Sequence, residues 1–285
     1  MTSIAFQGQP GAYSDLICRL SYPGMTTLPC ETFEAAIDSV HNGRAALAML
    51  PPENSIAGRV ADMHALLPDS GLSIIGEKFL RVEHCLLAPP GASLKTIRRI
   101  HSHPVALGQV RNLIRELGAM AVVEYDTAGS AEIVEKLNNI EDAAIASSLA
   151  GELHGLTILR RNVEDAAHNT TRFYVMAKSP VVPPPETPDL MTTFLFNVRN
   201  VPAALFKALG GFATNGVNMT KLESYMVNGT FTATQFLAEV DGHPAQPSLR
   251  LAFEELAFFS SEIKILGTYP ADPFRLAQRV SASNT

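Results

Sequence analysis

Apolar residues recur along the first part of the chain with two different spacings. Short continuous apolar runs predict buried strands, for example at Ser3–Phe6, Ala45–Leu50 and Asp142–Ala146. Between these runs the apolar positions follow the spacing of amphipathic helices, most clearly over Pro104–Leu117. Strands that alternate with helices predict an α/β fold, because the helices cover the faces of a largely parallel sheet.

A proline-rich segment, Ser179–Asp189, ends this part of the chain and predicts a stiff, extended linker. The pattern beyond it reads strand, helix, strand, strand, helix, strand, which is a ferredoxin-like βαββαβ arrangement. Asn215–Gly216 predicts the end of the first helix, and Asn228–Gly229 predicts a hairpin between the two middle strands. We therefore predict an N-terminal domain at 1–178, a linker at 179–189, a βαββαβ domain at 190–270 and a loose tail at 271–285.

The composition is that of a soluble protein with a sizeable core. Of the 285 residues, 46% are hydrophobic and 18% are charged, and the net charge is −6. A nucleic-acid-binding domain is normally basic, so this balance argues against such a partner. No apolar run is long enough to span a bilayer, and the N-terminus lacks a signal-peptide pattern. Three cysteines without disulfide or metal-ligand spacing predict reduced thiols and a cytoplasmic location.

Five polar loops fall beyond the carboxyl ends of predicted strands, where open α/β sheets bind their ligands. They are Gln7–Ser14, Pro51–Ser55, His101–Gln109, Asp126–Ala131 and Asn169–Phe173. Each is rich in hydroxyls, amides or glycines and precedes a helix or adjoins a strand end. The unpaired N–H groups of a helix N-terminus favour negative charge, so these loops predict a site for a small organic acid.

Each loop also has a plainer interpretation. Serine and threonine before a helix often serve only as N-caps, and Glu53–Asn54 fits an ordinary turn. His101 and His103 lack an acidic or cysteine partner at suitable spacing, so we predict no metal site. The glycines of the first loop match no nucleotide-binding pattern. The residue patterns alone predict an α/β ligand-binding protein with a small C-terminal domain.

Taken in order, the loops resemble the motifs of the prephenate dehydratases, the enzymes that make phenylpyruvate from prephenate. The T-R-F signature of that family is present as Thr171–Arg172–Phe173, and its E-N-S loop as Glu53–Asn54–Ser55. Its S-H-P segment is Ser102–His103–Pro104, followed by Gln109, and its G-x-Y-S opening is Gly11–Ala12–Tyr13–Ser14. The resemblance runs from about Ile4 to Tyr269.

The resemblance implies a catalytic domain of two α/β lobes, like those of type II periplasmic binding proteins, with the site in the cleft. The second lobe, at about 80–160, is then an insertion into the first. The chain is expected to cross from one lobe to the other near Glu77–Val82 and to return near Arg160–Asp165. The catalytic residues that it implies are Thr171, Glu53, Asn54, Ser102 and Gln109. The implied substrate-binding residues are Tyr13, Ser14, Ser55, His103, Thr127, Asn169, Thr170, Arg172 and Phe173.

The implied reaction expels the ring hydroxyl of prephenate as water and one carboxylate as carbon dioxide. The ring becomes aromatic, which supplies the driving force, so no metal or organic cofactor is expected. The family resemblance puts Thr171 at the leaving hydroxyl, as a hydrogen-bond donor or proton relay. Glu53 is the alternative acid if burial favours its protonated form. Arg172 is expected to pair with a carboxylate of the substrate or of the protein.

The C-terminal domain resembles an ACT domain, a regulatory unit that binds L-phenylalanine in this family. The implied phenylalanine-binding residues are Pro202, Ala203, Ala204, Leu205, Asn218, Met219, Glu223 and Ser224. The family's usual P-G-A-L has alanine at position 203 here, and its usual E-S-R-P ends in Tyr225–Met226. L-phenylalanine inhibition is expected, and the alternative for this domain is dimer packing without a ligand. Exposed sheet edges often pair across subunits, so a homodimer or homotetramer is expected.

Two other functions remain open at this point. An arogenate dehydratase would act on a substrate with an amine in place of the side-chain ketone. A non-catalytic small-acid binding or sensor protein would keep the cleft without the chemistry, although intact T-R-F and E-N-S motifs argue against it.

Overall fold

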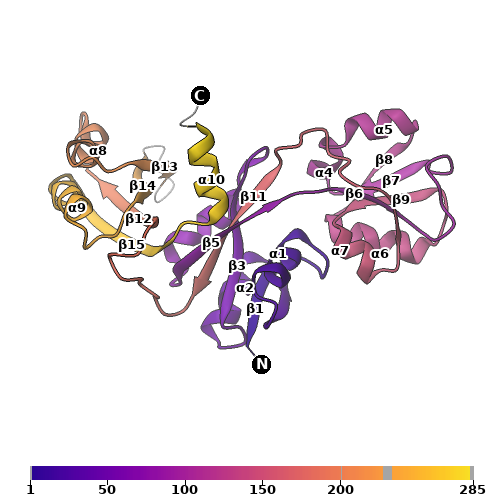
Figure 1. Cartoon of the computed structure of the whole chain (residues 1–285), viewed down its shortest axis with the longest axis horizontal. Coiled ribbons are helices and arrows are strands. Elements are labelled where there is room, and N and C mark those ends of the chain that lie inside the picture. The colour runs from indigo at the N-terminus through magenta and orange to yellow at the C-terminus, as the bar shows by residue number, and fades with distance from the viewer. Residues whose placement is uncertain (1, 200, 227–232, 283–285) are drawn as a thin grey trace. The chain divides into compact units, whose positions relative to one another are not determined.

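The computed structural model describes residues 2–199, 201–226 and 233–282. The chain forms two compact units (Figure 1). The first consists of Met1–Leu67 and Lys78–Tyr174, and the second of Pro68–Glu77 and Val175–Thr285. Residues 68–77 therefore belong with the C-terminal part of the chain, which the sequence did not predict.

The first sheet has the strand order β2 (Thr26–Cys30), β1 (Ser3–Gln7), β3 (Leu47–Asn54), β11 (Thr170–Ala177) and β5 (Ser73–Arg81), and β4 (Gly58–Arg59) pairs with β3. Strand β1 runs parallel to both of its neighbours. The helices that connect these strands are α1 (Tyr13–Ser21), α2 (Phe33–His41) and α3 (Ala61–Leu66), followed by the 3₁₀ turn Leu67–Asp69. This sheet confirms the predicted α/β class for the first lobe.

The second sheet has the order β10 (Thr157–Arg160), β6 (Cys85–Ala88), β9 (Asp142–Ala146), β7 (Arg99–Ser102) and β8 (Met120–Val123). Alternate residues of β6 and β9 face opposite sides, as the period of two in a strand requires. Leu86 and Ile145 pack with α4 (Pro104–Gly108) and α5 (Arg111–Leu117). Leu87 and Ala144 pack with α6 (Thr127–Leu137) and α7 (Ser148–Leu153). Helices thus cover both faces, which explains why β9 is apolar throughout.

The chain passes between these two sheets twice. Residues 82–84 connect β5 to β6, and residues 161–169 connect β10 to β11. The first passage begins five residues later than the sequence predicted, and the second begins within one residue of the predicted position. They are tied together, because the backbone N–H of Val82 donates to the carbonyl of Asn169 at 2.8 Å.

The stretch predicted as one helix, Pro104–Leu117, is two helices. Helix α4 ends at Gly108, and α5 begins at Arg111. The carboxylate of Asp165 accepts hydrogen bonds from the backbone N–H groups of Arg111 at 2.9 Å and Asn112 at 3.2 Å. A residue from the second passage therefore caps the new helix start, so the break depends on a contact that helical periodicity does not reveal.

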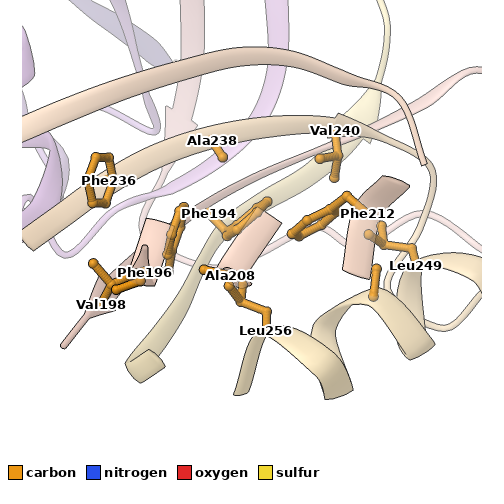
Figure 2. Packing of buried hydrophobic residues seen from close by; sticks show 12 residues of the cluster. Phe194, Phe196, Val198, Ala208, Phe212, Phe236, Ala238, Val240, Leu249 and Leu256 are labelled. Carbon is orange, nitrogen blue, oxygen red and sulfur yellow. The ribbon is translucent and has the colours of Figure 1, made fainter. Parts of the chain in front are cut away.

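The C-terminal part of the chain contains the predicted βαββαβ order: β12 (Leu190–Val198), α8 (Ala204–Thr214), β13 (Met219–Met226), β14 (Ala233–Asp241), α9 (Pro247–Phe259) and β15 (Ser260–Pro270). The antiparallel sheet has the order β13, β14, β12, β15. Its core lies between the sheet and both helices, where the Phe194 and Phe212 rings stack with centroids 5.7 Å apart (Figure 2). The predicted Asn228–Gly229 hairpin lies outside the described residues.

Residues 178–189 form neither helix nor strand, as the prolines predicted. The loose tail predicted from residue 271 is wrong for most of its length. Helix α10 (Pro273–Ala282) occupies it, and the Arg275 guanidinium donates to both oxygens of Glu77 at 2.7 and 2.8 Å. Glu77 belongs to the segment Pro68–Glu77 of the same unit, which is far from α10 in the sequence. The local sequence pattern therefore could not predict this contact.

Cys18, Cys30 and Cys85 are buried free thiols, as predicted. None of the helices in the described ranges is long and apolar enough to cross a membrane.

Candidate active site

A cavity of about 530 Å³ lies within the first unit. Its walls come from the loop before α1, the end of β3, the starts of α4 and α6, and one face of β11. Its size falls within the usual range of small-molecule sites. Nine of the predicted site residues line it: Tyr13, Ser14, Asn54, His103, Gln109, Thr127, Asn169, Thr171 and Phe173. Five others do not: Glu53, Ser55, Ser102, Thr170 and Arg172.

The alternation of β11 divides the T-R-F motif between two environments. Thr171 and Phe173 line the cavity, whereas the Arg172 side chain lies on the opposite side of the strand. The buried Arg172 guanidinium donates to Glu53 Oε1 at 2.9 Å and lies 4.8 Å from the centre of the Tyr174 ring. Arg172 therefore pairs with a carboxylate of the protein, which was one of the two partners predicted for it.

The predicted residues Ser102, Ser55 and Thr170 support the walls of the cavity. The Ser102 hydroxyl is buried and donates to the Ile145 carbonyl at 2.7 Å, joining β7 to β9. The Ser55 hydroxyl donates to the His168 carbonyl at 2.8 Å and accepts from the Thr170 N–H at 2.9 Å. Ser55 thus fastens the end of β3 to the start of β11.

The orientation of the Asn54 amide follows from its neighbours. Its Oδ1 accepts from the backbone N–H groups of Ile56 at 2.9 Å and Ala57 at 2.8 Å, and a backbone N–H only donates. The Asn54 Nδ2 therefore donates, to Asn169 Oδ1 at 2.8 Å and to Thr171 Oγ1 at 2.9 Å. Because the Thr171 oxygen accepts from Asn54, its own proton remains available to a group in the cavity.

The hydrogen bonds continue from Asn169 to a histidine that the sequence analysis missed. Asn169 Nδ2 donates to Gln109 Oε1 at 3.0 Å, and His84 Nε2 lies 2.8 Å from the same oxygen. The other ring nitrogen of His84 lies 2.7 Å from the Tyr13 hydroxyl. His84 directly precedes β6, and a histidine at the start of a buried apolar strand was the available signal.

Burial sets the protonation states at this end of the cavity. Burial lowers the pKa of His84, although the Gln109 hydrogen bond and the Glu164 carboxylate act in the opposite direction. Burial likewise raises the pKa of Tyr13 well above its ordinary value. His84 is therefore a neutral imidazole and Tyr13 a neutral phenol near neutral pH.

The cavity contains few sources of positive charge for an anionic ligand. No lysine or arginine is among the described residues that line it, whereas Asp62 and Asp126 do line it. The first residues of α1 and α6, Tyr13 and Thr127, also line it. The partial positive charge of these helix N-termini, together with the amide and hydroxyl donors, has to hold any carboxylate.

One glycine allows the first loop to approach the second lobe. Gly11 has a φ of +89°, and a Cβ placed on it would lie 2.8 Å from the Cα of Ala150. The Ser147 hydroxyl donates to the Gly11 carbonyl at 2.5 Å. The loop that carries Tyr13 is thereby fixed against α7.

The residues predicted to bind phenylalanine lie on α8, on β13 and directly before them. Pro202 and Ala203 directly precede α8, and Ala204 and Leu205 are its first two residues. Ala203 has a φ of +62°. Asn218 precedes β13, which contains Met219, Glu223 and Ser224. The Asn218 amide donates to Asp241 at 2.9 Å, and Arg279 of α10 also contacts Asp241.

Comparison with known proteins gives consistent results over most of the chain. The profile of the family described as prephenate dehydratase matches residues 4–181. A "Bifunctional N-acyl-homoserine lactone acylase/prephenate dehydratase" of Komagataeibacter europaeus is 64% identical over 95% of this chain and 97% of that protein. An "Arogenate dehydratase/prephenate dehydratase 1, chloroplastic" of Arabidopsis thaliana is 37% identical over 95% of this chain and 73% of that protein.

Two solved structures are similar over almost their full length. One, named "GqqA- a novel type of quorum quenching acylases", is 63% identical with a TM-score of 0.91, over 96% of this chain and 99% of that one. The other is a prephenate dehydratase from Arthrobacter aurescens in complex with L-Phe. It is 27% identical with a TM-score of 0.86, over 99% of this chain and 98% of that one.

Proposed function

Because the chain belongs to the prephenate dehydratase family, we propose that it converts prephenate to phenylpyruvate, water and carbon dioxide. The observation that carries the proposal is the orientation of Thr171 at the cavity. Asn54 donates to the Thr171 oxygen at 2.9 Å, so the Thr171 proton is left to donate to the departing hydroxyl of the substrate. A leaving hydroxide needs such a donor, because its charge develops as the carbon–oxygen bond breaks.

Glu53 is a weaker candidate for the proton donor. Its carboxylate lies outside the cavity lining and accepts from the Arg172 guanidinium at 2.9 Å. A carboxyl group directed at Arg172 and away from the cavity is not placed to donate to a substrate there. We assign Glu53 and Arg172 to the support of β3 and β11, and the donor role to Thr171.

One substrate carboxylate is assigned to the N-terminal end of α1, with Ser14 as hydroxyl donor. The other is assigned to the Thr127 hydroxyl rather than to the N–H groups of α6, because the Asp126 carboxylate already accepts from the Gly129 N–H there. Phe173 is assigned to contact the face of the substrate ring. This arrangement holds the two carboxylates apart, and the carboxylate that leaves as carbon dioxide and the hydroxyl that leaves as water can then align for elimination.

The test is turnover of prephenate by the purified chain and by variants of Thr171. Thr171→Ala should lower kcat by about 10²–10⁴-fold, because it removes the hydrogen-bond donor that stabilises the departing hydroxyl. Thr171→Ser keeps the hydroxyl and should retain much more activity. Thr157→Ala, the same substitution at an exposed position of β10, is the matched control. A Thr171→Ala variant with normal kcat would remove Thr171 from the mechanism.

Arogenate is the alternative substrate, as the names of the Arabidopsis relatives suggest. The same protein should be assayed with both compounds at equal concentration. If kcat/KM is higher for arogenate than for prephenate, arogenate becomes the proposed substrate, and the role of Thr171 stays the same.

A second activity, cleavage of the amide bond of N-acyl-homoserine lactones, is supported by the 64% identical relative of that name. Apolar side chains in the cavity wall, including Phe33, Val60 and Val105, suit an acyl chain. Release of the free acid from an acyl-homoserine lactone tests this activity. If both reactions share the cavity, prephenate should inhibit that release competitively.

L-phenylalanine is proposed to inhibit the enzyme through the C-terminal domain, which we assign as an ACT domain in a cytoplasmic homo-oligomer. The complex of the Arthrobacter aurescens protein with L-Phe supports this assignment. Turnover should fall in the presence of L-phenylalanine, and equilibrium dialysis should show binding. Absence of binding at millimolar concentrations would leave the domain with a packing role only.

A further inference from the structure

His84 occupies the first passage between the two sheets and connects two walls of the cavity. Its side chain is buried, with 2% of the residue exposed. One ring nitrogen lies 2.7 Å from the Tyr13 hydroxyl of α1, and the other lies 2.8 Å from Gln109 Oε1 beside α4. Both ring nitrogens therefore have partners within the protein, which argues against His84 as the group that exchanges a proton with the substrate.

The hydrogen-bond order along the cavity is fixed from the Asn54 end. Asn54 has to donate to Asn169 Oδ1, because backbone N–H groups occupy its own oxygen. The Asn169 amide is then oriented with its Nδ2 toward Gln109, whose Oε1 accepts at 3.0 Å. An amide oxygen only accepts, so the His84 nitrogen that faces this oxygen has to carry a proton.

This requirement selects one tautomer of His84. With the proton on Nε2 and a neutral ring, Nδ1 accepts. The Tyr13 hydroxyl then donates to Nδ1 at 2.7 Å rather than to the Glu83 carbonyl, which lies 3.1 Å away. The opposite tautomer would place two acceptors 2.8 Å apart at Gln109. If the Gln109 amide were rotated to relieve that contact, its NH₂ group would accept no hydrogen bond and would face the NH₂ group of Asn169, so two donors would be opposed. If Asn169 were rotated as well, its NH₂ group would face the NH₂ group of Asn54, and the conflict between donors would only move there.

We propose that His84 is a positioning residue for the dehydration. As a neutral imidazole protonated on Nε2, it donates to Gln109 and completes the chain of hydrogen bonds that holds Gln109 and Asn169 beside Asn54, the residue that donates to Thr171. The inference rests on the proposed function, because it assigns the chain of amides to the same proton donor.

The first test measures the tautomer directly and does not depend on turnover. Nitrogen-15 chemical shifts of labelled histidine side chains distinguish the two neutral tautomers and the imidazolium, and the His84→Gln spectrum assigns the signal. At neutral pH we expect His84 to be protonated on Nε2 alone. A ring protonated on Nδ1, or on both nitrogens, would overturn the inference.

The second test compares two amide substitutions in turnover of prephenate. The amide of His84→Gln can reach the place of Nε2 and keep the donor to Gln109, whereas the shorter amide of His84→Asn reaches only the place of Nδ1. We expect His84→Asn to lower kcat by about 10²-fold with a smaller change in KM, as a misplaced catalytic group does. His84→Gln should recover at least about tenfold of that loss.

His154→Gln is the matched control, since His154 lies in the same lobe, pairs with Glu135 at 2.6 Å and does not line the cavity. Thermal unfolding of each variant shows whether it is folded. Equal loss of kcat in His84→Gln and His84→Asn, or no loss in either, would overturn the positioning role. An inactive wild-type protein would overturn the proposed function itself, and that outcome is distinct from an active enzyme that tolerates both substitutions.

Discussion

Replacing Asn54 by aspartate tests the direction of the hydrogen bonds around Thr171 with almost no change of shape. The retained Oδ1 still accepts from the Ile56 and Ala57 N–H groups. The second oxygen replaces Nδ2 and lies where Thr171 Oγ1 is 2.9 Å away. An ionised carboxylate only accepts, so Thr171 has to turn its proton toward it and away from the cavity.

The expected effects on catalysis and on stability differ in size. Thr171 keeps a hydrogen bond, but as donor to the wrong partner, so kcat should fall by about 10²–10³-fold, the loss typical of one aligned donor. The carboxylate also opposes Asn169 Oδ1 at 2.8 Å, and Asn169 is buried. The loss of the Asn54 donor to Asn169 Oδ1, and the approach of two acceptors there, should lower the free energy of unfolding by about 1–3 kcal/mol.

The assay is steady-state turnover of prephenate, with urea unfolding to measure the loss of stability. Asn54→Asp should regain part of its kcat as the pH is lowered, because the protonated carboxyl again donates a hydrogen bond. Asn54→Ala, which introduces no acceptor, should show no such recovery. Normal kcat for Asn54→Asp at neutral pH would refute the assigned order of donors and acceptors.

Three further predictions follow from individual positions. Ala203→Gly should stabilise the protein by about 1 kcal/mol in urea unfolding, because Ala203 has a φ of +62° and glycine adopts that conformation without the cost. Gly11→Ala should lower kcat/KM for prephenate and the thermal midpoint together, since the new Cβ would lie 2.8 Å from the Cα of Ala150. The Arg99 guanidinium beside Asp142 holds the pKa of that carboxyl below its usual range. The ionised Asp142 therefore stabilises the folded protein fully above a pH of about 4, the ordinary pKa of an aspartate in the unfolded chain. This contribution to the free energy of unfolding is lost as the pH falls through the lowered pKa. Asp142→Asn should therefore flatten the acid side of the curve of stability against pH.

The secondary structure that rests on local patterns could be predicted from the sequence. The apolar run of β9 and the helix stop at Asn215–Gly216 follow from period and turn chemistry, and both are observed. The elements that were missed depend on distant partners. Asp165 creates the start of α5, and Glu77 anchors α10 through Arg275. A window of neighbouring residues contains neither contact.

In the candidate site, too, local motifs could be predicted from the sequence, whereas features that depend on distant partners could not. Motif resemblance identified the loops, and nine of the fourteen predicted residues line one cavity. It did not identify which side of each strand a residue faces, so Ser102 and Arg172 were placed beside the substrate although they support the walls. His84 was missed because its importance comes from two partners, Tyr13 and Gln109, that lie 71 and 25 positions away.

The T-R-F motif is best understood as one strand segment that serves two faces. Thr171 and Phe173 point to the cavity, and Arg172 points to Glu53 on the neighbouring strand β3. Asn54, the next residue of β3, returns to the cavity side and holds Thr171. The ion pair between the buried Arg172 guanidinium and the partly exposed Glu53 carboxylate thus ties the two strands together beside the position where Asn54 meets Thr171. Removing Glu53 would take one hydrogen-bond acceptor from the buried Arg172 guanidinium, a loss of about 1–3 kcal/mol. The T-R-F motif therefore has two physical roles, a hydrogen-bond donor on one face of the strand and an ion pair that supports it on the other.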